Sequence, residues 1–244
     1  MKSATKRLVV IPTYNETSNV TILIPRLFKY IPDLSILFVD DGSPDGTAEI
    51  CQKLQPQFPH LFIENRNQKL GLGSAYRFGF HWGLQRDYEE LIEMDADMSH
   101  RVRDLAAMID ARVKDPGAGL VIGSRWTKGG STINWPKQRE LLSRGANLYV
   151  RFMLGMGVSD ATAGFRIYSA DTLRKIDLDQ IKSEGYSFQI EMTRAAKKAG
   201  ARIIEVPIVF RERENGVSKM SKAIVREAMI RVTIWGLKRF LRMN

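Results

Sequence analysis

The amino-acid sequence predicts an α/β fold built on a mostly parallel sheet. In the first half of the chain, short apolar runs with the length of buried strands alternate with segments whose apolar residues recur at helical spacing. Clusters of glycine, proline, aspartate and serine separate these segments. Repeated βαβ units of this kind produce parallel strands covered by helices. Ligands bind to such sheets outside the carboxyl ends of the strands.

The expected elements follow closely on one another. Strands are expected over residues 7–11, 35–39, 61–63, 91–95 and 119–123. Helices are expected from residue 18 or 19 to about 30, over 47–55, from the Gly71–Ser74 turn to about 85, and over 102–113. Pro12 is expected to end the first strand, and Ser18 or Asn19 to cap the helix that follows it.

Beyond Arg125 the pattern becomes less regular. A helix with basic residues on one side is expected over 137–154, and a short strand at 167–168. A helix over 188–199 ends before Gly200, and a strand over 203–210 contains Pro207. Because proline is confined to strand edges, this last strand is expected at the border of the sheet. A final helix is expected from residue 223 almost to the end.

Composition limits the classes of protein and partner. The 244 residues fit one large domain, and 44% of them are hydrophobic, as in a globular protein with a core. Cys51, the one cysteine, rules out an internal disulfide and fits a reducing compartment. No signal peptide and no transmembrane helix are expected. Residues 125–151 carry six basic residues against one acidic, and residues 211–244 nine against three, which indicates an anionic partner.

Polar residues follow the ends of several predicted strands and are expected to converge on one edge of the sheet: Asn15, Asp40, Asp41, Asp95, Asp97 and Arg125. Strand alternation would point Asp95 and Asp97 to the same side. Two such carboxylates repel each other unless a cation lies between them, and Mg²⁺ or Mn²⁺ with substrate phosphates fits this role. The alternative is a solvated acidic turn that caps the next helix. The convergence with the other strand ends favours the metal.

Characteristic motifs lie along nearly the whole chain, at residues 12–16, 39–47, 70–73, 94–100, 123–125, 143–147 and 162–166, and at Arg213, Gly216, Ser218 and Lys219. They resemble the motifs of inverting glycosyltransferases of family 2 with a GT-A fold, and within that family those of the dolichyl- and polyprenyl-phosphate mannose synthases. Any one of these motifs is weak evidence, but the set in this order is specific. The resemblance implies a metal-dependent GT-A domain over residues 1–244.

The resemblance also implies roles for individual residues. The nucleotide sugar would contact Pro12, Tyr14, Glu16, Asp41, Asp95, Ala96, Asp97, Arg213 and Lys219. Mg²⁺ or Mn²⁺ would bind Asp95, Asp97 and Ser99, the last standing where some relatives have glutamine. The acceptor phosphate would contact Arg125, Arg139 and Ser143, and Ser218 would help to close over the diphosphate. The residues central to transfer would be Asp97, Arg125, Arg213 and Lys219.

The implied reaction moves mannose from GDP-mannose to dolichyl or polyprenyl phosphate. A phosphate monoester has a second pKa of about 6 and is largely dianionic at neutral pH, so no catalytic base is expected. His100, beside the acidic pair, is therefore expected to have a local structural role. In-line attack would invert an α-linked donor to a β-linked product.

The lipid acceptor implies a membrane surface as a further partner. Residues 137–155 and 222–243 are expected to form helices at the membrane interface, because basic amphipathic helices with Trp and Phe bind there. The alternative is that their apolar sides pack on the domain. The expected location is peripheral, at the cytoplasmic face of a membrane, with a membrane-anchoring subunit as a further expected partner.

Three rival functions remain at this point. One is a lipid-phosphate transferase that uses a UDP-sugar, although such relatives usually carry transmembrane helices. Another is a sugar nucleotidyltransferase, which would have a Gly-rich basic loop where this chain has residues 12–16. The third is a nucleic-acid binder, indicated only by the pI of about 9.8. We expect no nucleic acid, because acidic strand ends repel a phosphate backbone.

Overall fold

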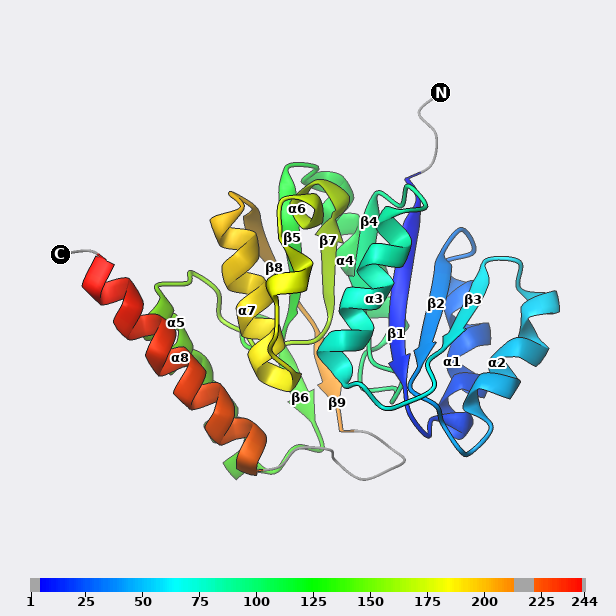
Figure 1. The fold of residues 1–244 in the computed structure, drawn as a ribbon, viewed down its shortest axis with the longest axis horizontal. Coiled ribbons are helices and arrows are strands. Elements are labelled where there is room, and N and C mark those ends of the chain that lie inside the picture. Colours follow the sequence, from blue (N-terminus) through cyan, green and yellow to red (C-terminus); the bar gives the residue numbers. More distant parts are fainter. Residues whose placement is uncertain (1–4, 213–221, 243–244) are drawn as a thin grey trace.

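The computed structural model describes residues 5–212 and 222–242, and its centre is a seven-stranded sheet between two helical layers (Figure 1). The strand order is β3-β2-β1-β4-β7-β5-β8. These strands are β1 (Arg7–Thr13), β2 (Ser35–Asp40), β3 (Leu61–Asn65), β4 (Glu90–Glu93), β5 (Ala118–Ser124), β7 (Arg166–Ser169) and β8 (Arg202–Pro207). Only β7 runs antiparallel to its neighbours β4 and β5. The predicted α/β fold with a mostly parallel sheet is confirmed.

Helices occupy both faces of this sheet. They are α1 (Thr17–Tyr30), α2 (Thr47–Leu54), α3 (Leu72–Leu84), α4 (Val102–Lys114), α5 (Lys137–Leu154), α6 (Ala170–Arg174), α7 (Gly185–Lys198) and α8 (Lys222–Arg242), with the short 3-10 helices η1 (Gln55–Gln57) and η2 (Leu178–Gln180). Figure 1 shows α5 and α8 side by side at the edge of the molecule, beyond α7. In the described part of the chain, no helix is both long and apolar enough to cross a bilayer.

The central strand β1 contributes to two separate cores, one on each face. Leu8 and Val10 pack in the core that includes Phe80 of α3, whereas Val9 and Ile11 pack in the core that includes Leu23 of α1. Successive side chains of a strand point to opposite faces, so an uninterrupted apolar run marks a strand buried on both sides. The apolar run at residues 8–11 therefore explains why helices cover both faces.

The first strand extends through Pro12, contrary to the expectation that this proline ends it. Val10 is the last residue of β1 paired with β4, and the pairing with β2 continues to Thr13. Val10 and Pro12 are two residues apart and face the same neighbour, β4, which has ended before Pro12. The missing N–H of Pro12 therefore interrupts no hydrogen bond of the ladder.

Helix α1 begins earlier than the sequence predicted. The helix begins at Thr17, with Glu16 at the N-cap position, so Ser18 and Asn19 lie inside the first turn. Asn19 donates through Nδ2 to the Glu16 carboxylate at 2.7 Å. This side-chain bond ties the helix start to a residue that the sequence assigns to the site.

The strand expected over residues 203–210 is split into two. β8 lies at the edge of the main sheet, as Pro207 indicated, and the buried Ile208 separates it from β9 (Val209–Arg211). β9 pairs with β6 (Ser131–Ile133), a strand that the sequence did not predict, in a second sheet of two strands. This small sheet carries Phe210 to the edge where the strands of the main sheet end.

We expect Gly79→Ala to destabilise the fold, because α3 packs directly on β1 at this glycine. A Cβ at Gly79 would lie 2.3 Å from Val10 Cγ1. Relieving that clash shifts α3 and costs about 1–3 kcal/mol in the free energy of unfolding, measured by urea denaturation. Gly145→Ala in α5 is the matched control, since no atom lies within 4 Å of its added Cβ and helix propensity favours alanine by about 1 kcal/mol. Equal effects of the two changes would contradict this packing.

Candidate active site

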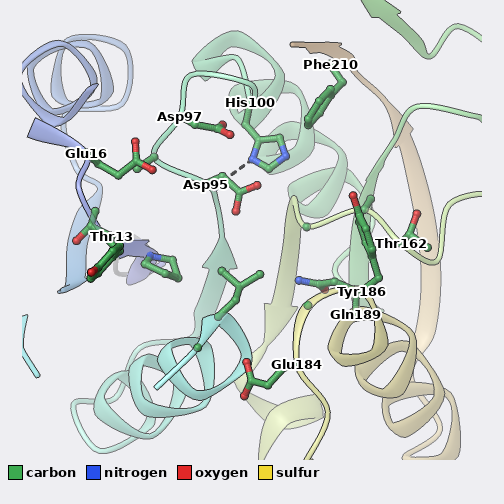
Figure 2. Close-up of a pocket in the computed structure, with 18 of the residues that line it drawn as sticks. Thr13, Glu16, Asp95, Asp97, His100, Thr162, Glu184, Tyr186, Gln189 and Phe210 are labelled. Carbon is green, nitrogen blue, oxygen red and sulfur yellow. Dashed lines mark hydrogen bonds between the residues drawn. The ribbon is translucent and has the colours of Figure 1, made fainter. Parts of the chain in front are cut away.

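A cavity of about 510 Å³ lies where the carboxyl ends of the parallel strands meet (Figure 2). The predicted residues that line it are Pro12, Tyr14, Glu16, Asp41, Asp95, Ala96, Asp97, Arg125 and Arg139. They come from segments more than a hundred residues apart in sequence. The structure thus brings together most of the predicted site.

The acidic residues stand in a loop after β4 rather than on the strand. β4 ends at Glu93, and residues 96–98 bend, with Met98 at a φ of 64°. The prediction that strand alternation aligns Asp95 and Asp97 is therefore wrong, although both line the cavity. Asp97 Oδ1 accepts from the backbone N–H of Ser99 at 3.1 Å, and this bond shapes the loop.

The donor set of this loop fits a hard divalent cation. Asp95 and Asp97 present carboxylates to the cavity, and Mg²⁺ and Mn²⁺ prefer oxygen ligands completed by substrate phosphates or water. Ser99 Oγ is buried and has no hydrogen-bond partner among the described residues. Within residues 5–212 and 222–242, no three or more His, Cys, Asp or Glu side chains lie together so that they could hold a metal ion.

His100 holds the acidic loop from behind. Its Nδ1 accepts from the backbone N–H of Asp95 at 3.1 Å, a bond visible in Figure 2. Its ring stacks on Phe165 with the centroids 4.5 Å apart. Burial lowers the pKa of His100 to about 4, against the opposing charge of Asp97, so the imidazole is neutral at physiological pH. Its observed contacts are those of a support for Asp95.

The opposite wall of the cavity comes from the segments after β1 and β2. Tyr14 and Glu16 follow β1, and the Lys69 ammonium lies 4.0 Å from the centre of the Tyr14 ring. Asp41 accepts from Arg66 Nε at 2.7 Å and from the backbone N–H groups of Leu70 and Gly71. Asp41 therefore also fastens the loop before α3 to the edge of the sheet.

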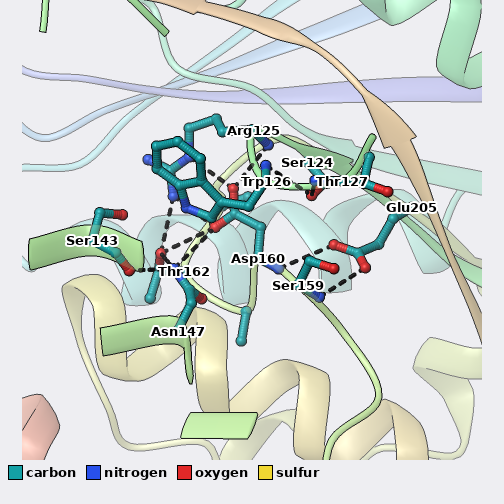
Figure 3. Close-up of polar contacts among 12 residues, drawn as sticks. Ser124, Arg125, Trp126, Thr127, Ser143, Asn147, Ser159, Asp160, Thr162 and Glu205 are labelled. Carbon is teal, nitrogen blue, oxygen red and sulfur yellow. Dashed lines mark hydrogen bonds and ion pairs between the residues drawn. The ribbon is translucent and has the colours of Figure 1, made fainter. Parts of the chain in front are cut away.

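Arg125 is anchored by a buried network (Figure 3). Its Nε and Nη2 donate to the two carboxylate oxygens of Asp160 at 2.8 and 2.7 Å, and Nη2 also donates to Thr162 Oγ1 at 2.9 Å. The Glu205 carboxylate accepts from the backbone N–H groups of Ser159 and Asp160 and fixes that loop. Burial alone would raise the pKa of Asp160, but Arg125 outweighs it and holds the pKa below its usual value. Both partners therefore stay charged.

Aromatic rings surround the same guanidinium. Trp126, Trp135 and Phe210 have their ring centres 5.4–5.5 Å from Arg125 Cζ. Such cation–π contacts restrict the arginine without using its N–H donors. Nη1 donates to no residue of the described chain, and Arg125 lines the cavity. The Nη1 group of Arg125 can therefore donate hydrogen bonds to an anion in the cavity.

A second cavity of about 70 Å³ adjoins the first between α5, α7 and α8. Residues that line both are Arg125, Trp135, Arg139, Thr162 and Tyr186. Ser143 lines only the second, together with apolar residues such as Leu142, Val150 and Val232. Arg139 forms an ion pair with Glu212 and lies 4.2 Å from the centre of the Trp135 ring. The predicted acceptor group thus lies where a polar cavity meets an apolar one.

The predicted site and the lining of the cavity do not coincide completely. Arg213, Gly216, Ser218 and Lys219 lie outside the described residues. Lining residues that sequence reasoning gave no role include Lys69, Trp135, Glu184, Tyr186, Gln189 and Phe210. Tyr186 and Gln189 are three residues apart in α7, a spacing that places them on one face of the helix. The sequence shows this spacing, but it does not show that this face of the helix lines the cavity.

Comparison with known proteins agrees with this geometry. The model of "Glycosyl transferase family 2" matches residues 8–177. The chain is 49% identical to polyprenol monophosphomannose synthase of Mycolicibacterium smegmatis, over 96% of this chain and 88% of that one. It is also 49% identical to undecaprenyl-phosphate mannosyltransferase of Micrococcus luteus, over 94% of this chain and 93% of that one.

Solved structures share the fold at low sequence identity. Glucosyl-3-phosphoglycerate synthase of Mycobacterium tuberculosis, in complex with uridine diphosphate, superposes with a TM-score of 0.68 at 18% identity, over 96% of this chain and 81% of that one. The mannosyltransferase PcManGT of Pyrobaculum calidifontis, in complex with GDP-Man and Mn²⁺, gives 0.59 at 17% identity, over 99% and 65%. The predicted GT-A fold is confirmed.

Proposed function

The chain belongs to glycosyl transferase family 2, and we propose that it transfers mannose from GDP-mannose to the phosphate of a polyprenyl phosphate, with inversion. The observation that carries this proposal is the path of the cavities. The larger one extends from Tyr14 and Glu16, past Asp95 and Asp97, to Arg125, and there it adjoins the apolar cavity between α5 and α8. Nucleotide, diphosphate, acceptor phosphate and lipid would follow one another along this path.

The acceptor phosphate would lie against Arg125, whose orientation Asp160 fixes. A guanidinium meets phosphate oxygens with parallel N–H donors and keeps its charge at any physiological pH. A phosphate oxygen then attacks the anomeric carbon in line while the bond to the diphosphate oxygen breaks. Because the phosphate already carries the negative charge, no side chain has to accept a proton. The product is a β-linked mannosyl phosphate when the donor is α-linked.

A divalent cation, Mg²⁺ or Mn²⁺, would be held by Asp95 and Asp97. It supplies charge that offsets the negative charge developing on the departing nucleoside diphosphate. Ser99, the third predicted ligand, is buried and does not line the cavity, so its hydroxyl would reach the cation only after the loop rearranges. PcManGT, in complex with GDP-Man and Mn²⁺, is a precedent for the pairing of this donor and this ion on the same fold.

The outer faces of α5 and α8 would rest on the membrane that holds the lipid acceptor. One side of α8 packs inward through Ala228 and Val232. The opposite side stays exposed, as does a stripe of α5; the exposed apolar residues are Leu141, Leu142, Leu148, Phe152, Ile230, Ile234, Leu237, Phe240 and Leu241. Phe152 and Phe240 have ring centres 6.4 Å apart and join the two stripes. Exposed basic residues on the same helices, such as Arg151 and Lys238, favour an anionic bilayer.

We expect Leu148→Asp and Phe152→Asp to weaken binding to anionic liposomes by about tenfold each, because burying one large apolar side chain in lipid contributes about 1.5–3 kcal/mol. Flotation at increasing salt measures the binding, and the wild type should bind less tightly as salt screens the basic residues. Val113→Asp, on an exposed position of α4, is the matched control and should bind like the wild type. Equal loss in all three variants would contradict membrane contact through these helices.

The activity itself is tested by which sugar reaches the lipid. Radiolabelled GDP-mannose, UDP-glucose and UDP-N-acetylglucosamine are each offered with a short polyprenyl phosphate and Mg²⁺ or Mn²⁺. We expect label in the lipid phase from GDP-mannose alone, and a β-configured product by NMR. Transfer from a UDP-sugar instead would replace the proposed donor, and transfer without any lipid phosphate would replace the proposed acceptor.

A further inference from the structure

The side-chain amide of Gln189, buried in the large cavity, has no hydrogen bond of ordinary geometry in the described part of the chain, although it lies near the Glu93 carboxyl. Gln189 belongs to α7, is 2% exposed and lines the cavity. Buried polar groups are nearly always hydrogen-bonded, so this one calls for an explanation. An amide carries both a donor and an acceptor, and a sugar with neighbouring hydroxyls satisfies both at once.

The position of this amide matches the place of the transferred sugar. A Cβ built on Gly164 would lie 3.6 Å from Gln189 Nε2 and 3.9 Å from Asp95 Oδ2, so the two side chains converge on the space in front of this glycine. Figure 2 shows Gln189 pointing into the cavity, with Asp95 beyond it and with Tyr186 and Thr162 to one side. Gln189 therefore lies between the acidic loop and the wall that carries Arg125.

The backbone of Gln189 is firmly held although its amide is not. Its carbonyl accepts from Arg166 Nη1 at 2.9 Å and from Thr193 Oγ1 at 2.8 Å. Arg166 is fully buried and also donates to the carbonyls of Ala161 and Ala163, the segment that leads to Gly164. One buried arginine thus sets both sides of this space, and the amide end is presented on a rigid support.

We infer that Gln189 is a specificity-determining residue that hydrogen-bonds hydroxyl groups of the donor hexose. This inference rests on the proposed function, since it places the sugar of a nucleotide sugar between Asp95 and Arg125. The competing structural role is a contact with the neighbouring carboxyl of Glu93, which Gln189 also approaches. The two roles make different predictions for an apolar replacement of similar shape.

Gln189→Met removes both polar atoms and keeps an unbranched side chain. We expect about a hundredfold lower kcat/KM for GDP-mannose, because a site that reads hydroxyl groups loses that much discrimination or more without its partner. The Kd for GDP, which has no hexose, should stay within twofold, and so should the KM for polyprenyl phosphate. The midpoint of thermal unfolding should fall little, because the contact of Gln189 with Glu93 lacks ordinary hydrogen-bond geometry. Gln52→Met, at an exposed position of α2, is the matched control.

Deoxy-sugar donors identify the hydroxyl concerned. A GDP-deoxymannose that lacks the contacted hydroxyl should be a poor donor for the wild type, and Gln189→Met should make it no worse. Unchanged use of GDP-mannose by Gln189→Met would overturn the inference, as would parallel losses of GDP and GDP-mannose binding or a lowered unfolding midpoint with normal donor selectivity. A wild type that transfers no mannose would instead overturn the proposed function, so the two failures are distinguishable.

Discussion

Asp97→Ala is expected to reduce mannosyl transfer about a thousandfold, the loss of about 4 kcal/mol of transition-state stabilisation. Asp97 lines the cavity at the loop where the diphosphate would bind, and its carboxylate would be one of the two that hold the cation. Because its Oδ1 also accepts from the Ser99 N–H, alanine disturbs the loop as well. Asp97→Asn keeps that acceptor and removes only the charge. Initial rates, together with Mn²⁺ binding in the presence of GDP followed by electron paramagnetic resonance, should show both variants to be defective.

The variant His100→Asn tests whether the reaction needs a side chain that accepts a proton, as distinct from the negative charge that Asp97→Ala removes. Asn Oδ1 takes the place of imidazole Nδ1, so the bond from the Asp95 N–H is kept while the titratable ring is lost. We expect this variant to retain most of the activity and the pH dependence of the wild type. Both variants lose the stacking on Phe165, but His100→Ala also loses the bond that supports Asp95 and should therefore be less active. If His100→Asn were as inactive as Asp97→Ala, a base would be required and the dianionic acceptor would not explain the reaction.

The sequence predicted the sheet, and the edge of the sheet that carries the site residues, because both depend on local patterns. Apolar runs of strand length, such as residues 8–11, mark strands buried on both faces, and parallel strands bring their carboxyl ends together wherever they lie in the sequence. That rule placed Asp41, Asp95 and Arg125 in one cavity. The bend after β4 was missed because Met98 adopts a positive φ that its side chain does not favour.

Other parts of the site depend on tertiary contacts that have no local signal. β6 and β9 are three residues long, and their paired residues, such as Ser131 and Val209, are far apart in the sequence, so neither strand is detectable alone. Asp160 stands in a polar loop that resembles many solvated loops, and only the fold shows that it is buried against Arg125. Gln189 looks like any residue of an amphipathic helix until its face is known. Long-range pairing, rather than composition, decides these roles.

Arg125→Met is expected to cost about 3–5 kcal/mol in the free energy of unfolding at neutral pH, because it leaves the Asp160 carboxylate buried without its counter-charge. Both side chains are buried in the wild type, and the pair is bidentate. Asp160→Asn alone likewise leaves the arginine buried without its counter-charge. In the double variant Arg125→Met/Asp160→Asn no buried charge remains, so at least half of the loss should be recovered. Chemical denaturation of the four proteins gives the coupling free energy directly.

The pH dependence of this loss identifies its origin. In the wild type the pKa of Asp160 is lowered, so the pair stabilises the fold above the usual aspartate pKa of about 3.9 and this contribution is lost as pH falls through the folded-state value. In Arg125→Met, burial without a counter-charge raises the pKa instead, and the variant regains stability as the carboxylate is protonated. The gap between wild type and variant should therefore be wide at pH 7.5 and narrower near pH 4. A gap that did not change with pH would contradict this origin and would assign the loss to packing around Trp126 and Trp135 rather than to the ion pair.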